Sequence, residues 1–182
     1  MSVITGFFAY LAANSSQIFN LLLEHIRLTA IAVGVSILIG VPLGIFICYI
    51  RKASKPILGL ANIIQAVPSM ALLGFAIPLL GIGTLPAVVV VVLYSLLPIV
   101  RNTCLGLDQV PEHLIEAGRG MGMTRTYRLV HVEIPIAAPI IFTGIRIAAV
   151  NAIGTAVFAS FVGGGGLGSV ITTGIRQEDM QA

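Results

Sequence analysis

The sequence predicts an all-α fold, a polytopic membrane helical bundle with about four spans. Of the 182 residues, 57% are hydrophobic and only 9% are charged, and the mean hydropathy is +1.04. A soluble domain carries about 25% charged residues, so this chain cannot cover itself with polar surface in water. The net charge of +3 comes from short basic clusters between apolar runs, which indicates membrane orientation and not nucleic-acid binding. A soluble globular domain is therefore disfavoured.

The first segment, residues 1–24, is predicted to be an amphipathic helix at the membrane interface. Polar residues interrupt its apolar run in the middle: Asn14, Ser15, Ser16, Gln17 and Asn20. The next run, residues 28–50, carries no charge and is long enough to cross a hydrocarbon core of about 30 Å. A basic cluster follows it at once, formed by Arg51, Lys52 and Lys55.

The uncharged run over residues 56–100 is too long for a single span. As one helix it would be about 67 Å long at a rise of about 1.5 Å per residue. We place the break at residues 81–86, where Gly and Pro concentrate. This gives two spans, 57–80 and 85–104. Pro68 lies within the first of them and predicts a kink.

A polar stretch, from Arg101 to Glu133, separates these spans from the last one. Residues 105–133 are predicted to form short helices outside the membrane. A last span is predicted over residues 134–162, interrupted by Arg146.

Positive charges predict the orientation of the spans. Seven of the ten Lys and Arg residues lie near residues 51–55 and in the polar stretch, which are on the same side of the predicted bundle. The positive-inside rule puts that side in the cytoplasm. The amino terminus, the turn at residues 81–86 and the glycine-rich segment at residues 163–168 then face outward.

The glycine-rich segment contains Gly163-x-Gly165-x-x-Gly168, which fits a dinucleotide-binding fingerprint. That fingerprint requires a preceding strand, a following helix and an acidic residue about 20 positions on. No strand is predicted here, Asp179 is at the wrong distance, and the segment faces away from cellular ATP and NAD. The sequence favours a glycine-rich turn after a span.

Residues for catalysis or for metal binding are not evident in the sequence. The two lysines, Lys52 and Lys55, do not form a Walker A motif. Cys48 and Cys104 lack a partner at metal-ligand spacing and are interpreted as small core residues. The three histidines are scattered along the chain: His25, His113 and His131. We therefore expect no enzyme activity, no cofactor and no metal site.

The polar stretch contains the sequence EAGRGMG at residues 116–122, followed by VEIP at residues 132–135. This resembles the EAA loop of binding-protein-dependent ABC import permeases, whose pattern is E-A-A, three free residues, G, nine free residues, then I-x-L-P. Gly118 replaces the second alanine of the pattern. The matching residues are Glu116, Ala117, Gly122, Val132, Ile134 and Pro135. An amphipathic loop lying on lipid headgroups is the alternative interpretation.

The resemblance implies an ABC type-1 permease fold, in which this loop is a coupling helix that docks on a cytoplasmic ATPase. The small residues Ala117 and Gly118 allow close approach of backbones. Gly122 can take a positive φ and turn the chain between two short helices. Pro135 can start the following span. Glu116 either pairs with a basic group of the partner or caps its own helix.

A narrower resemblance covers residues 25–175. Four segments are similar to the osmoprotectant branch of these permeases, which imports glycine betaine, carnitine, choline and related betaine-like compounds: residues 63–75, 77–83, 93–103 and 161–168. Members of the family usually continue with one more hydrophobic span, so we expect the final span of the family to be missing from this chain.

The resemblance also implies the partners. These are cytoplasmic ABC ATPase subunits that bind the ATP, an extracellular substrate-binding protein or fused receptor domain, a second permease copy in a homodimer or heterodimer, and the lipid bilayer of the plasma or inner membrane. Nucleic acid is not expected. Aromatic cages hold quaternary ammonium groups, but this chain has no Trp and its Tyr and Phe are dispersed. The cage is therefore expected in the receptor.

Polar residues inside spans are costly unless they face protein or water. Gln65 and Asn151 are therefore candidates for the translocation pathway, together with the kink at Pro68. The alternative role for these residues, and for Arg146, is a hydrogen bond that stabilises the fold. Its partner could be a backbone carbonyl that a proline leaves without a helical donor. An ion-coupled secondary transporter is disfavoured because the predicted spans contain no Asp or Glu. A non-transporting scaffold is disfavoured by the EAA-like loop.

Overall fold

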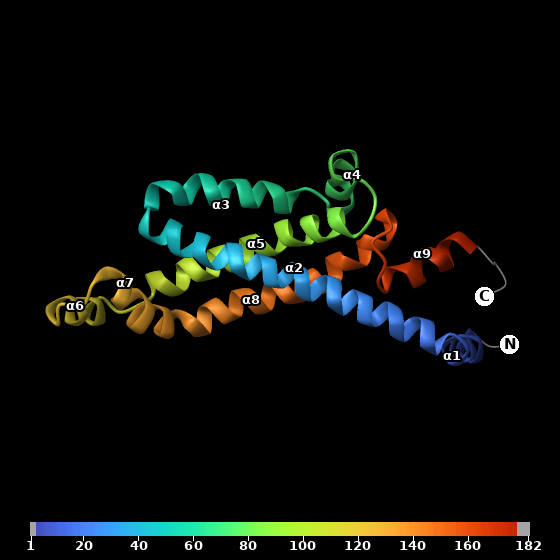
Figure 1. Ribbon diagram of the computed structural model, residues 1–182, viewed down its shortest axis with the longest axis horizontal. Helices are drawn as coiled ribbons and strands as arrows, with labels where there is room; N and C mark the ends of the chain where they lie inside the picture. The colour runs from blue at the N-terminus through green and yellow to red at the C-terminus, as the bar shows by residue number, and fades with distance from the viewer. Residues whose placement is uncertain (1–2, 178–182) are drawn as a thin grey trace. The chain divides into compact units, whose positions relative to one another are not determined.

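The computed structural model describes the backbone of residues 3–177 and the side chains of residues 8–175 (Figure 1). All regular elements in this range are helical, which confirms the all-α prediction. In chain order they are α1 (Val3–Ala13), α2 (Ser15–Tyr49), α3 (Arg51–Ala66), α4 (Ser69–Leu80), α5 (Thr84–Asp108), α6 (Glu112–Gly120), α7 (Arg125–Arg128), a π-helical turn (Leu129–Glu133), α8 (Ile134–Ala156), a 3₁₀ segment (Val157–Val162) and α9 (Gly168–Gln177).

Three helical segments are long and apolar enough to cross a membrane: Ser15–Tyr49, Thr84–Asp108 and Arg125–Val162. A fourth span exists if α3 and α4 are counted as one broken span. The prediction of about four spans is therefore confirmed.

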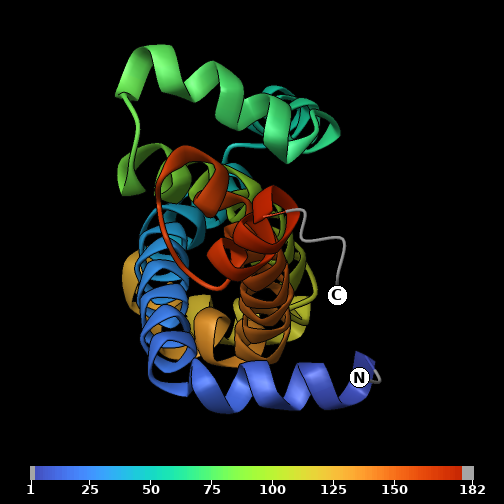
Figure 2. The same cartoon turned by 90° about the vertical axis from the view of Figure 1, so that its right-hand side faces the viewer.

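The first span begins earlier than predicted. A turn at Asn14 separates α1 from α2, and Figure 2 shows α1 turning away from the start of α2. From Ser15 onward α2 is one unbroken helix, so the boundary expected near residue 28 is wrong. Asn20 lies four residues after Ser16 and three after Gln17, so these side chains share one face of the helix. They therefore give α2 a polar face and do not end it.

The predicted span 57–80 consists of two helices. Val67 (φ −75°, ψ 131°) and Pro68 (φ −57°, ψ 135°) are both extended, so α3 ends at Ala66 and α4 begins at Ser69. Proline disfavours the helical conformation of the residue before it, which explains the end of α3. The kink predicted at Pro68 is therefore a complete break in the helix.

The chain divides into two compact units. Unit 1 contains Met1–Ala32, Pro68–Val91 and Ala152–Ala182, and unit 2 contains Val33–Val67 and Val92–Asn151. Three helices, α2, α5 and α8, contribute residues to both units.

In unit 1 the last span ends in the glycine-rich turn. The 3₁₀ segment leads into this turn and α9 follows it; Figure 2 shows α9 beside the 3₁₀ segment. The N–H of Gly83 donates to the carbonyl of Val162 at 2.7 Å, and the N–H of Gly164 donates to that of Ala159 at 2.8 Å. A helical segment, and not a strand, precedes the glycines, so the nucleotide fingerprint lacks its structural context.

In unit 2 the helices approach one another closely. A core cluster is formed by Leu107, Val110, Ala137 and Ile141. Gly44 of α2 lies so near α5 that an added Cβ would stand 2.9 Å from the carbonyl oxygen of Val100. Together with Gly40 it forms a small-xxx-small motif, which allows two membrane helices to pack at short distance.

We expect Gly44→Ala to lower the thermal unfolding temperature of the purified protein in detergent. The new methyl group must push α2 away from α5, and overpacking of this kind costs about 1–3 kcal/mol. Gly34→Ala is the matched control, because Gly34 is on the same helix and has nothing within 4 Å of the added Cβ. Equal unfolding temperatures for the two variants would contradict the close packing of α2 against α5 at Gly44.

Candidate functional site

The C-terminal end of α6 is a tight turn centred on Gly122. The N–H of Met123 donates to the carbonyl of Gly118 at 3.0 Å, and the N–H of Gly122 donates to that of Arg119 at 2.9 Å. This is the Schellman pattern, in which a glycine usually takes the left-handed position. The φ of Gly122 is 76°, so the positive value expected from the sequence is confirmed. Other residues adopt this conformation at a cost of about 1–2 kcal/mol.

Gly118 is buried and lies against the side chain of Arg128. A Cβ added at Gly118 would stand 3.1 Å from Cδ of Arg128 and 3.4 Å from Sδ of Met123. An alanine at this position, as in the EAA pattern, would force these atoms to move by a few tenths of an ångström. The glycine therefore leaves room for Arg128.

Arg128 forms a buried ion pair with Glu133. The Nε atom of Arg128 lies 2.7 Å from Oε1 of Glu133, and the two side chains are only 8% and 5% exposed. The hydroxyl of Tyr49, at the end of α2, donates a hydrogen bond to the other carboxylate oxygen of Glu133. The guanidinium of Arg125 stacks over the Tyr49 ring, 4.1 Å from its centroid. These contacts attach the region after α6 to α2.

This ion pair is not evident from the sequence. Both residues belong to the loop predicted to lie outside the membrane, and a spacing of five does not bring side chains together on an α-helix. They lie at the two ends of the π-helical turn, which widens the helix locally. The sequence shows two opposite charges five residues apart. This spacing indicates an ion pair only if the π-helical turn is known.

The α8 helix begins at Ile134, as predicted for the last span, but helical turns precede it, so Pro135 does not start the helical segment. Residues 125–162 form that one continuous segment. In the π-helical turn the N–H of Ile134 donates to the carbonyl of Leu129, five residues back. A regular α-helix would bring the ring of Pro135 against the carbonyl four residues before it. The wider turn accommodates the proline inside the helix.

Glu116 and Ala117 are exposed on α6, whereas Gly118 faces inward. The residue that precedes α6 is Pro111, and no side chain caps this helix. Glu116 therefore does not cap its own helix, which removes one of the two alternatives left open by the sequence. Figure 1 shows α6 and α7 together, where α5 ends and α8 begins. The exposed face of α6 is accessible to a partner.

A cavity of about 310 Å³ in unit 2 brings together two of the predicted pathway residues. It is lined by Gln65, Leu97, Pro98, Arg101, Asn102, Ile147 and Asn151. Its volume is at the lower end of the range of about 300–1,000 Å³ for ligand pockets. Pro68, which was predicted with Gln65 and Asn151, is not among the lining residues.

Gln65 also has a structural role. Because Pro98 has no N–H, the carbonyl of Tyr94 lacks its usual helical partner. The side-chain amide of Gln65 donates to that carbonyl at 3.0 Å, and the hydroxyl of Tyr94 donates to the carbonyl of Val67. The pairing with a proline-freed carbonyl, left open by the sequence, is thus present for Gln65. The same side chain borders the cavity.

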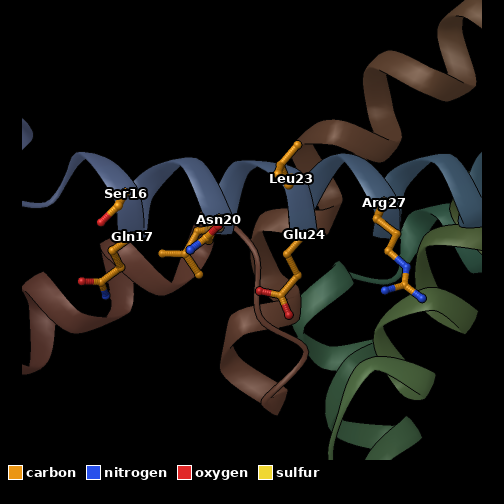
Figure 3. Close-up of a pocket in the computed structure, with 7 residues that line it drawn as sticks. Ser16, Gln17, Asn20, Leu23, Glu24 and Arg27 are labelled. Atoms are coloured by element: carbon orange, nitrogen blue, oxygen red, sulfur yellow. The ribbon is translucent and has the colours of Figure 1, made fainter.

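A second polar pocket, of about 650 Å³, lies along the first half of α2 (Figure 3). It is lined by Ser16, Gln17, Asn20, Leu21, Leu23, Glu24 and Arg27. Figure 3 shows Glu24 and Arg27 projecting from the same side of the helix. The N–H of Gly166 donates to the Glu24 carboxylate at 3.0 Å, which ties the glycine-rich turn to α2. This pocket was not predicted from the sequence, although its polar residues recur there at helical spacing.

Comparison with known proteins agrees with this architecture. Residues 36–182 match the family described as the inner membrane component of binding-protein-dependent transport systems. The chain is 49% identical over 177 residues to the osmoprotectant import permease protein OsmW of Salmonella typhimurium (strain LT2), covering 94% of this chain and 82% of OsmW. It is 45% identical over 167 residues to the choline transport system permease protein OpuBB of Bacillus subtilis (strain 168), covering 92% and 77%.

The fold is similar to that of a chain of the MetNI methionine ABC transporter in an inward-facing conformation. The TM-score is 0.77 at 25% identity, over 90% of this chain and 81% of that one. Long apolar helices and a family match over most of the sequence thus lead to one conclusion. The chain is a multi-pass membrane protein that belongs to the inner membrane components, or permeases, of binding-protein-dependent ABC transport systems.

Proposed function

We propose that this permease imports quaternary-ammonium osmoprotectants, such as glycine betaine, carnitine and choline, in an ATP-driven transporter. The names of OsmW and OpuBB, which refer to osmoprotectants and to choline, support the substrate class. An ion-coupled secondary transporter and a non-transporting scaffold are not favoured, because the chain belongs to an ABC permease family.

The observation that carries the proposal is the firm attachment of an exposed helix to the spans. The α6 helix presents Glu116 and Ala117 outward and ends at Gly122. The buried pair of Arg128 and Glu133 connects the following segment to α2. In our proposal the cytoplasmic ABC ATPase docks on α6, and Glu116 pairs with a basic group of the ATPase.

Motion of the docked ATPase would then be transmitted to the spans through the buried pair of Arg128 and Glu133, which is costly to separate. Separation of a buried ion pair leaves an uncompensated charge and costs about 3–5 kcal/mol. A displacement of α6 would therefore move α2 and α8 with it and would not break the pair. ATP binds to the ATPase, a second permease copy completes the passage, and an external binding protein or receptor domain delivers the substrate.

The cavity in unit 2 is the proposed translocation site. Arg101, Asn102 and Asn151 supply donors and acceptors, and the guanidinium matches the carboxylate of a zwitterion such as glycine betaine. The lining contains no aromatic side chain that would form a cage for the ammonium group. The cavity would thus guide the carboxylate end of the substrate, whereas the receptor selects its quaternary ammonium group.

We expect Gly122→Leu to abolish co-purification of the ATPase while the permease still inserts into the membrane. The reason is the positive φ of Gly122, which leucine adopts only with strain. Asn is the informative comparison, because it tolerates the left-handed conformation although its side chain is also large. Gly122→Asn should therefore retain much more ATPase than Gly122→Leu.

One outcome of that experiment would contradict docking on α6, and another would contradict the role of the positive φ at Gly122. Normal ATPase binding by Gly122→Leu would remove α6 as the docking element. Equal loss in both variants would show that the space at position 122 matters and its backbone conformation does not.

Substrate-stimulated ATP hydrolysis in liposomes, with the cognate ATPase and receptor, tests the substrate class. We expect stimulation by glycine betaine and by choline. Arg101→Gln should reduce the response to glycine betaine several-fold more than the response to choline, because choline has no carboxylate for the guanidinium to bind. Asn151→Leu should reduce both responses.

The control is Lys55→Gln, which also removes one positive charge but does not line the cavity. Gln65→Leu is a poorer test, because it also leaves the carbonyl of Tyr94 without its donor. An equal loss for both substrates in Arg101→Gln, or normal transport by Asn151→Leu, would refute the pathway role. The absence of stimulation by any betaine, choline or carnitine, with the ATPase bound, would refute the substrate class.

A further inference from the structure

Three potential metal ligands come together where α2 ends against α5. Cys104 and Asp108 are four residues apart on α5 and therefore share one face of the helix. Cys48 reaches them from α2. Its Sγ atom lies 3.5 Å from Oδ1 of Asp108, and Sγ of Cys104 lies 3.8 Å from Oδ2. All three ligand atoms lie within 4.8 Å of one another.

The expectation that Cys48 and Cys104 have no partner is wrong. Cys48 and Cys104 are 56 positions apart, so no local spacing reveals them as a pair. The structure brings them together through the packing of two helices. Both thiols are free and only half-buried. Neither they nor Asp108 take part in the proposed coupling or in the cavity.

The three ligand atoms are close enough for one tetrahedral ion. With bonds of about 2.3 Å to sulfur and about 2.0 Å to oxygen, tetrahedral Zn²⁺ holds a sulfur and an oxygen ligand about 3.5 Å apart. The observed distances are 3.5 Å from Cys48 to Oδ1 and 3.8 Å from Cys104 to Oδ2, so a turn of the carboxylate is needed for one oxygen to face both sulfurs. One ligand atom from each of the three residues already lies within 4.8 Å of the others. Helical bundles often build metal sites from side chains on facing helices, as here.

We propose that Cys48, Cys104 and Asp108 bind one thiophilic divalent cation of the Zn²⁺ type. Two thiolates favour such an ion over Mg²⁺ or Ca²⁺, which prefer oxygen ligands. Water completes the tetrahedron, as in zinc sites with three protein ligands. The bound ion links α2 to α5.

Arg51 is a competitor for Asp108. Its guanidinium lies 3.7 Å from Oδ1, but its side chain is 88% exposed and that of Asp108 is 48% exposed. Exposed ion pairs of this kind contribute little to stability. The cation can therefore displace Arg51, and removal of Arg51 should not weaken the site.

The test uses the full chain, purified in detergent with reduced thiols and without a polyhistidine tag, titrated with Cd²⁺. We expect a thiolate-to-metal charge-transfer band that saturates at one ion per chain, is lost on addition of Zn²⁺ and persists with excess Mg²⁺. The thermal unfolding temperature should rise with the metal concentration, because the folded state holds the ion.

Four variants test whether the three named residues, and not other groups of the chain, bind the metal. Cys48→Ser and Cys104→Ser should each weaken binding by more than the roughly 10–100-fold that loss of an outer-shell partner causes. Asp108→Asn should weaken it at least about tenfold. Arg51→Gln should bind at least as tightly as the wild type. Metal-free unfolding temperatures show that each variant is folded.

Several results would overturn the proposal. They are absence of the band in the reduced wild type, binding that survives in the double variant Cys48→Ser/Cys104→Ser, and binding by Asp108→Asn equal to that of the wild type. The first would exclude the site. The second would assign the metal to other residues, and the third would leave a dithiol without the carboxylate ligand.

Discussion

The buried ion pair between Arg128 and Glu133 is the interaction on which the arrangement of the polar loop depends. Two charges that are only 8% and 5% exposed must stay paired, because separation would leave a charge without water or a partner. Glu133 also accepts from Tyr49, so the pair connects the segment after α6 with the end of α2. Gly118 gives Arg128 the space it needs. The small exposed helix is thereby held against spans that contribute the apolar bulk of the chain.

The sequence predicts features that depend on few residues or on composition. A chain in which only 9% of the residues are charged cannot cover its surface with polar groups in water. A membrane bundle of apolar helices can therefore be predicted from the composition. Gly122 could be predicted because the left-handed position in a helix-ending turn favours glycine by local sterics alone. The break at Pro68 is also local, although its size was underestimated: both Val67 and Pro68 are extended, and the helix stops.

Features that depend on packing between distant segments could not be predicted. Arg128 and Glu133 meet because a π-helical turn replaces the regular spacing. The side-chain amide of Gln65 donates to the carbonyl of Tyr94. Pro98 predicts that this carbonyl needs a donor, but it does not predict that Gln65 is the donor. Cys48 and Cys104 needed the approach of α2 to α5. The early start of α2 was missed because polar residues on one face resemble an interruption when they are considered in linear order.

The most direct test of the buried pair as the connection between the loop and the spans is a double-mutant cycle in the reconstituted transporter. It uses Arg128→Met, Glu133→Gln and the double variant, with the number of ATP molecules hydrolysed per imported substrate as the readout. If the pair is the connection, each single variant will hydrolyse ATP with little import, and the double variant will regain part of the coupling because neither charge remains buried alone. Normal coupling in either single variant, or additive losses in the double variant, would contradict this role of the pair.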